Sequence, residues 1–291
     1  MIEPRHVLVT GAAGNIGSHV TRHLRAEGVA VTAFSNVDYP DGFEAERLLV
    51  GDSTKEPDIA AALDASGTDL PPVDAVVHLA ALAHPSAGTP YDVYSTNVVS
   101  TFNVLAQAGA AGIKRAAIAS SINAYGVIFN SHRPMPAYFP LDEKIPTDID
   151  DWYSLSKQSD EWTARMAWRR WGIDIVAFRF PFTAPMERIK AMTGHVTENP
   201  DATLREGWSY LDVRDAARAV YLSLTMPISG VHPVLLAAPD TYFDEPTQEL
   251  LDKWAPDVPR LRPFVGHEML IDLTVAKTLL GFQAEHVLER D

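Results

Sequence analysis

Short apolar runs alternate with longer amphipathic stretches through the first 180 residues. The stretches at 16–26, 93–111 and 153–171 have the pattern expected of helices. Strands with few polar positions are those buried on both faces of a parallel sheet, and parallel strands need crossover helices between them. The alternation therefore predicts an α/β fold with a doubly wound parallel sheet and right-handed crossovers. The expected strands lie at 6–10, 29–34, 47–50, 75–79, 116–120 and 174–180.

The alternation fades after Arg179, where prolines become frequent. A helix is expected at 213–224 and a strand at 231–237, and both would return to the sheet. We expect the loop at 127–151, which contains Pro134, Pro136, Pro140 and Pro146, to form a wall of the substrate pocket or a plain surface connection. The predicted units are a main α/β domain at 1–182, completed by 208–238, and a small substrate-binding subdomain made of 183–207 and 239–291.

Composition excludes several classes of protein. No run approaches the roughly 20 apolar residues that span a bilayer, and the chain enters a strand at once, so we expect neither a membrane anchor nor a signal peptide. Cysteine is absent, which excludes disulfides and thiolate catalysis and favours the cytoplasm. The formal net charge of -14 repels phosphate backbones, so no nucleic-acid partner is expected.

A glycine-rich turn, Gly11-Ala12-Ala13-Gly14-Asn15-Ile16-Gly17, follows the first expected strand and opens the first helix. Glycines at this spacing permit a tight turn, close approach of the backbone to a pyrophosphate, and close packing of helix on strand. The helix N-terminus presents free N–H groups to the phosphates. We therefore predict a dinucleotide-binding loop in a Rossmann-type domain, with Asn15 and Ile16 beside the cofactor.

The end of the second strand selects between NAD and NADP. An acidic residue there would bind the adenine ribose and select NAD. This chain has Ser35 and Asn36 instead, which would tolerate a 2′-phosphate, although no arginine follows. The expected cofactor is NAD or NADP, with a lean to NADP, unless Asp38 reaches the ribose. Asp52 is expected at the adenine edge.

Tyr153 and Lys157 are separated by one helical turn, so both lie on the same helix face. Free tyrosine has a pKa of about 10, and a nearby ammonium group favours the ionised form that proton transfer requires. Ser121 ends the fifth strand at the edge of the sheet where ligands bind, and Ser120 is the near alternative. His19 and His23 share a helix face, but a third ligand is missing, so no metal site is expected.

These motifs resemble the extended short-chain dehydrogenase/reductase family, of the NAD-dependent epimerase/dehydratase type. The resemblance implies Ser121, Tyr153 and Lys157 as the catalytic residues. It also implies that Ser53, Leu79, Ala80, Ala81, Asn97 and Pro181 contact the cofactor, and that Ala83, Asn123 and Arg179 join Ser121 around the substrate. The matching segments are Thr10-Gly11-x-x-Gly14-x-x-Gly17, Gly51-Asp52, His78-Leu79-Ala80-Ala81, Asn97-Val98, Ser120-Ser121-x-x-x-Tyr125-Gly126 and Tyr153-x-x-x-Lys157.

The chain departs from the family at Arg214-Asp215, where Asp-Asp is usual, and in the short interval between Arg179 and Tyr210. The short interval is similar to that of uronate and small-sugar dehydrogenases. The leading hypothesis is therefore an NAD(P)-dependent oxidoreductase acting on a secondary alcohol or hemiacetal of a sugar-like small molecule. In this hypothesis Arg179 holds the carboxylate of a sugar acid.

Two alternatives stay open. One is a nucleotide-sugar epimerase or dehydratase, such as a UDP-sugar 4-epimerase, with tightly bound NAD. The other is a catalytically idle dinucleotide-sensing protein. The resemblance also favours a homodimer formed by the helices at 93–111 and 153–171, which carry Tyr94, Phe102, Trp162 and Met166.

Overall fold

A computed structural model of the chain describes residues 3–290. The predicted doubly wound parallel sheet is confirmed, and its seven strands follow the order β3-β2-β1-β4-β5-β6-β9. The strands are β1 (His6–Thr10), β2 (Ala30–Ser35), β3 (Arg47–Val50), β4 (Ala75–His78), β5 (Arg115–Ala119), β6 (Asp174–Arg179) and β9 (Val231–Leu235). The predicted strands agree with these to within two residues at each end.

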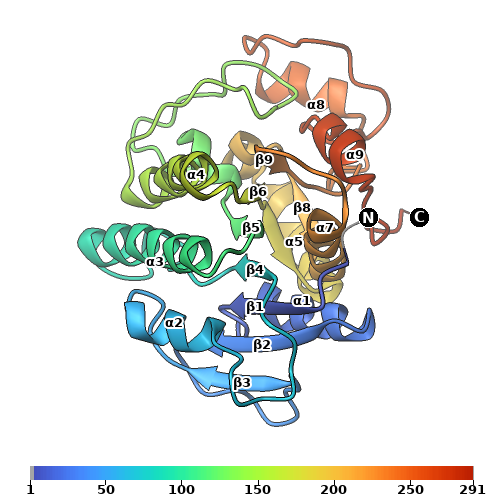
Figure 1. Cartoon of the computed structure of the whole chain (residues 1–291). Helices are drawn as coiled ribbons and strands as arrows, with labels where there is room; N and C mark the ends of the chain where they lie inside the picture. Colours follow the sequence, from blue (N-terminus) through green and yellow to red (C-terminus); the bar gives the residue numbers. More distant parts are fainter. Residues whose placement is uncertain (1–2, 291) are drawn as a thin grey trace.

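Helices cover both faces of the sheet (Figure 1). The helices on one face are α2 (Glu56–Leu63), α3 (Pro90–Ala110) and α4 (Trp152–Trp171), and those on the other are α1 (Asn15–Ala26) and α7 (Val213–Thr225). Each face has its own buried core, with Val104, Leu105 and Ala164 on the first and Val20, Leu24 and Val220 on the second. Strand order reverses between β1 and β4, which is where doubly wound sheets bind ligands.

A third core lies beyond the carboxyl end of the sheet, and it joins segments that are far apart in the sequence. Trp208, Leu204 and Leu270 are fully buried in it. Phe139 and Leu141, from the proline-containing loop, are also buried there and pair with Arg260 and Ile271. The elements of this region are β7 (Phe182–Ala184), α5 (Met186–Glu198), α6 (Pro200–Thr203), η2 (Leu204–Glu206), β8 (Tyr210–Asp212) and α8 (Thr247–Trp254).

The last helix, α9 (Thr274–Leu280), packs on the main domain, because Ala276 and Leu280 belong to the core beside α1 and α7. No helix between residues 3 and 290 is both long and apolar enough to cross a membrane. The fold therefore consists of one parallel sheet with helices on both faces and a smaller apolar region above its carboxyl edge.

Candidate active site

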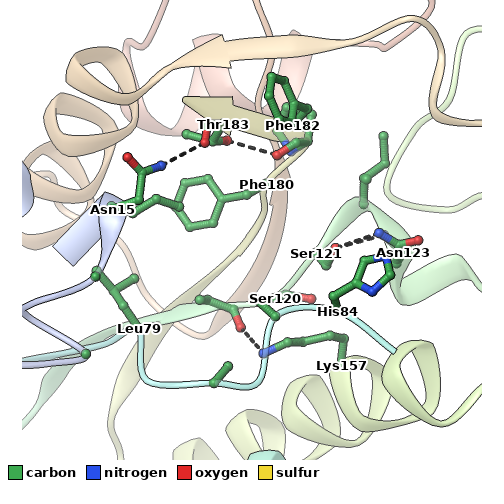
Figure 2. Close-up of a pocket in the computed structure, with 18 of the residues that line it drawn as sticks. Asn15, Leu79, His84, Ser120, Ser121, Asn123, Lys157, Phe180, Phe182 and Thr183 are labelled. Carbon is green, nitrogen blue, oxygen red and sulfur yellow. Dashed lines mark hydrogen bonds between the residues drawn. The ribbon is translucent and has the colours of Figure 1, made fainter. Parts of the chain in front are cut away.

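A cavity of about 550 Å³ opens at the carboxyl edge of the sheet (Figure 2). Its walls come from the segments that follow β1, β4, β5 and β6, so it lies at the reversal of strand order. Of the residues assigned from the sequence, the following line it: Gly11, Gly14, Asn15, Ile16, Gly17, Leu79, Ala81, Ala83, Ser121, Asn123, Tyr153, Lys157 and Pro181.

The glycine loop has the geometry that a dinucleotide requires. Gly11 has φ +68°, and a Cβ there would lie 2.7 Å from the backbone nitrogen of Ala80. A Cβ on Gly17 would overlap the carbonyl oxygen of Gly11. Helix α1 begins after Gly14 with no side-chain cap and no acidic residue in its first turn, so its N–H groups are available to an anion. These residues fit the pyrophosphate of a bound nicotinamide dinucleotide.

Asn15 connects this loop to a neighbouring segment of the cavity lining. Its Nδ2 donates a hydrogen bond of 2.9 Å to the carbonyl oxygen of Thr183 in β7 (Figure 2). The hydroxyl of Thr183 in turn donates to the carbonyl oxygen of Pro181 at 2.9 Å. The cofactor loop is thus bonded directly to the strand that leads into α5.

Tyr153 and Lys157 occupy the first two turns of α4, which starts after an N-cap in which Asp151 accepts from the backbone N–H of Ser154. The Nζ of Lys157 lies 6.0 Å from the centre of the Tyr153 ring. It donates to the carbonyl oxygen of Ala119 at 2.9 Å and to Oδ2 of Asp160 at 3.2 Å. Because an ammonium has three donors, one N–H of Lys157 is left for a ligand.

The charge of Lys157 influences its buried neighbours. Burial raises the pKa of Asp160 to about 6, against the opposing effect of the Lys157 ammonium. Burial and the same ammonium lower the pKa of His78 to about 3. His78 is therefore neutral near pH 7, and its ring nitrogens bond the hydroxyls of Thr10 and Thr101. This histidine supports the strand ends and does not line the cavity.

Ser121 and Ser120 have different partners. The Oγ of Ser121 accepts hydrogen bonds from the backbone N–H and the Nδ2 of Asn123, both at 3.1 Å (Figure 2). Its own proton is therefore free to be donated to a ligand in the cavity. The hydroxyl of Ser120 instead donates to Glu161 at 2.8 Å. This geometry favours Ser121 over Ser120 for contact with a substrate.

The predicted adenine end forms a second hollow beside the first. Asn36 and Asp52 line it, together with Val50, Gly51, Thr54, Leu82 and Thr96. None of these described residues is a lysine or an arginine. Ser35 is buried, and its Oγ accepts from the backbone N–H of Val37 at 3.3 Å. Ser53 is bonded to Ser100 at 2.6 Å and does not line the hollow.

Asn97 and Ala80 do not line the cavity, but they contact residues and segments that do. The Asn97 side chain accepts from the N–H of Leu82 at 2.8 Å and donates to the hydroxyl of Ser156 at 3.0 Å. Ser156 donates to the carbonyl oxygen of Tyr153 at 2.7 Å. Asn97 therefore links the loop after β4 to the helix of Tyr153, and Ala80 packs against Gly11.

Arg179 is not available to a substrate, so this part of the sequence prediction is wrong. Its side chain is 6% exposed and forms two hydrogen bonds to Glu161, at 2.8 and 3.0 Å. It also donates to the carbonyl oxygen of Glu143. The sequence could not reveal this pairing, because Glu161 comes from a different element. A charged residue at the end of a strand can form a buried ion pair as readily as it can contact a ligand.

Several cavity residues were not assigned from the sequence. His84, Phe180, Phe182, Thr183, Arg188 and Glu206 also line the cavity. Phe180 and Phe182 flank Pro181, which was a usable signal. No sequence signal pointed to Glu206, because it reaches the cavity only through the way in which the 183–207 segment folds. Among residues 3–290, no three His, Asp or Glu side chains are grouped to hold a metal ion.

Comparison with known proteins identifies the family. The model of the NAD dependent epimerase/dehydratase family matches residues 7–237. A UDP-glucose 4-epimerase from Azospirillum brasilense is 32% identical over 179 residues, covering 60% of this chain and 48% of that protein. A sterol demethylase protein B from Methylococcus capsulatus is 34% identical over 124 residues, covering 41% and 35%. The chain thus spans about a third to a half of the curated relatives it matches.

Solved structures share the whole fold. MoeE5 in complex with UDP-glucuronic acid and NAD superposes with a TM-score of 0.69 at 23% identity, covering 97% of this chain and 94% of that one. A short-chain dehydrogenase/reductase superfamily protein from Agrobacterium tumefaciens with bound NAD gives 0.68 at 22% identity, covering 97% and 93%. Both hold NAD, and the predicted lean to NADP has no support among them. With the family match spanning most of the chain and the sheet order in agreement, this protein belongs to the NAD dependent epimerase/dehydratase family.

Proposed function

We propose that this protein is an NAD-dependent enzyme that epimerises or dehydrates a nucleotide sugar by moving a hydride at a secondary alcohol carbon. The observation that carries the proposal is that Ser121, Tyr153 and Lys157 meet in one cavity with the glycine loop. The UDP-glucose 4-epimerases among its relatives favour this reading over the sugar dehydrogenase that the sequence suggested first.

NAD bound along the glycine loop would accept a hydride from the sugar carbon. In the proposed mechanism, Tyr153 takes the proton of the substrate hydroxyl and later returns it. Ser121 donates a hydrogen bond to the same oxygen, since both N–H groups of Asn123 already occupy its acceptor sites. Lys157 keeps a positive charge near the phenol and offers its remaining N–H to the cofactor ribose.

The cations available to a nucleotide diphosphate distinguish the candidate functions. Arg188 lines the cavity and lies over the Phe182 ring at 5.6 Å. Arg205, by contrast, is bonded to the backbone carbonyl groups of Arg133, Pro134 and Asp201, and Arg260 and Arg262 form ion pairs with Asp252 and Glu268. Binding of a diphosphate would therefore depend on Arg188. Among the described residues, Arg188 is the one Lys or Arg side chain besides Lys157 that lines the cavity, and this shortage of cations keeps a free-sugar dehydrogenase as the second candidate.

Incubation of the protein with NAD and UDP-glucose tests the proposal. An epimerase or dehydratase converts the sugar without accumulating reduced cofactor, a dehydrogenase accumulates one reduced cofactor per sugar, and a sensor binds NAD without turnover. Calorimetry with UDP, on the wild type and on Arg188→Gln, measures the nucleotide contact directly. Failure of UDP and UDP-sugars to bind the wild type would contradict the nucleotide-sugar proposal.

A further inference from the structure

The carboxyl group of Glu206 lines the active-site cavity without a protein partner. Glu206 ends η2 and is partly buried. Among residues 3–290, no side chain donates a hydrogen bond to its carboxyl group and no cation forms an ion pair with it, while the Ser209 hydroxyl donates to its backbone carbonyl oxygen. Burial alone raises its pKa to about 7. An unpaired polar group in such a place is costly, and a ligand that supplies the missing donor removes the cost.

The backbone around Glu206 is held firmly in place. The hydroxyl of Tyr125 donates to the carbonyl oxygen of Arg205. The Arg205 guanidinium is 9% exposed and bonded to three backbone carbonyl groups of neighbouring segments. Gly207 and Trp208 both have positive φ, at 70° and 52°, and the Trp208 indole donates to the carbonyl oxygen of Pro200 at 2.9 Å. A non-glycine residue such as Trp208 adopts a positive φ only where the surrounding packing imposes it. The packing around Trp208 therefore also fixes the position of the neighbouring Glu206.

A second acceptor lies in the same cavity. The Oδ1 of Asn123 is buried without a partner, while the amide nitrogen is used on Ser121. The wall beyond Ser121 therefore holds the Glu206 carboxyl group and, just beneath the surface, an amide oxygen that also lacks a donor. Hydroxyl or amino groups supply donors, whereas a carboxylate supplies acceptors and a repelling charge. The guanidinium of Arg179, which would have received a carboxylate, is already paired with Glu161.

We propose that Glu206 is a specificity-determining residue, which selects sugars that carry a hydroxyl or amino group where it contacts them and rejects sugars that carry a carboxylate there. This inference rests on the proposed function, because it concerns the substrate of the same site. It names the class of substrate as neutral or amino sugars and excludes uronates.

The test compares UDP-glucose with UDP-glucuronic acid, and galactose with galacturonate, by calorimetry in the presence of NAD. The members of each pair differ only in whether the sixth carbon is an alcohol or an acid. We expect the neutral member to bind at least about tenfold more tightly at about pH 8, because like charges placed together are strongly unfavourable. Glu206→Gln should reduce this preference to less than about threefold, while Glu198→Gln, an exposed carboxyl on α5, should leave it unchanged.

The pH dependence gives a readout that a merely structural role would not produce. Tyr125, Tyr242 and Arg205 are the titratable groups around Glu206, and His84, Arg188 and Lys157 line the same cavity. Between about pH 6 and about pH 8 the ionised fraction of a group with a pKa of about 7 rises from about a tenth to about nine tenths. Affinity for the acid member should fall by about tenfold over this range in the wild type and in His84→Gln, and stay level in Glu206→Gln.

The outcomes separate the two proposals. Tighter binding of an acid member at about pH 8, or an unchanged preference in Glu206→Gln, overturns the role of Glu206 while leaving the enzyme assignment standing. Binding of NAD with none of the four sugars overturns the proposed function, and the inference with it. If Glu206→Gln does not fold, the wild-type pH comparison still decides, because a level affinity for the acid contradicts the proposal.

Discussion

Tyr153 is the side chain on which the proposed chemistry depends most directly. Tyr153→Phe removes only the hydroxyl, so we expect turnover to fall by about 10²–10⁴-fold, the usual contribution of a general acid/base. Affinity for NAD should remain nearly unchanged, whereas Lys157→Ala should impair both turnover and NAD binding, because we propose that Lys157 also holds the cofactor ribose. Steady-state kinetics and a cofactor titration measure the two effects. A Tyr153→Phe enzyme that keeps more than about a tenth of the wild-type rate would exclude Tyr153 as the acid/base.

Asp52 lines the hollow in which we expect the adenine end of the cofactor to bind. Because Asp52 lines that hollow and no lysine or arginine does among the described residues, a 2′-phosphate would be repelled there. We expect the wild type to bind NAD more tightly than NADP, contrary to the lean that Ser35 and Asn36 suggested. Asp52→Asn should narrow the difference, and Ser35→Ala should not, since its side chain is buried. Titration with both cofactors decides, and equal affinities in the wild type would contradict the expectation.

At the scale of elements, the pair of Glu161 and Arg179 joins α4 to β6. Both side chains are buried, and Glu161 also accepts the hydroxyl of Ser120. Removing one member leaves a buried charge unpaired, so Arg179→Met should lower the free energy of unfolding by about 3–5 kcal/mol. The double variant Arg179→Met/Glu161→Gln should lose less than the single one, because the stranded carboxylate is gone. Urea denaturation measures the free energy of unfolding of both variants. A double variant less stable than Arg179→Met would refute the explanation that an unpaired buried carboxylate causes the loss.

Elements whose pattern is local could be predicted from the sequence, whereas contacts between distant elements could not. The strands were predicted to within a few residues because burial on two faces leaves a continuous apolar run, and the amphipathic helices at 16–26 and 153–171 were predicted equally closely. Reasoning from local motifs assigned Tyr153, Lys157 and the glycine loop to the functional site, and these residues line one cavity. It failed for Arg179 and overlooked Glu206, since their surroundings depend on how Glu161 and the 183–207 segment pack.

At the scale of the whole molecule, about half of the large exposed apolar side chains of the described residues lie on two neighbouring helices. Helices α3 and α4 lie side by side and expose Tyr91, Val99, Phe102, Leu155, Trp162 and Trp168. Large exposed apolar surfaces of this kind mark contacts between proteins. We therefore keep the proposal of a homodimer formed by these two helices, a closed arrangement that is the commonest among oligomers.

Light scattering tests the dimer. We expect the wild type to have the mass of two chains at micromolar concentration, and Phe102→Glu/Trp162→Glu to have the mass of one, because two charges on each chain would enter an apolar interface. Trp254→Glu, which changes an exposed tryptophan on α8, should leave the mass unchanged. A wild-type protein that stays a monomer at these concentrations would contradict the proposed homodimer.

The hydrogen bond from Asn15 to Thr183 has a kinetic consequence. It joins the phosphate-binding loop to β7, and both residues line the cavity, so we expect a bound dinucleotide to leave more slowly while this bond is intact. Asn15→Ala removes this bond and should speed NAD dissociation by about 2–10-fold, because one hydrogen bond contributes about 0.5–1.5 kcal/mol. Arg22→Ala, which changes an exposed residue of α1, is the control and should leave the rate unchanged. Stopped-flow displacement measures the residence time, and an unchanged rate in Asn15→Ala would show that this bond does not govern departure. A long residence suits an enzyme that gives the hydride back to the same sugar, whereas it slows one that must exchange its reduced cofactor on every cycle.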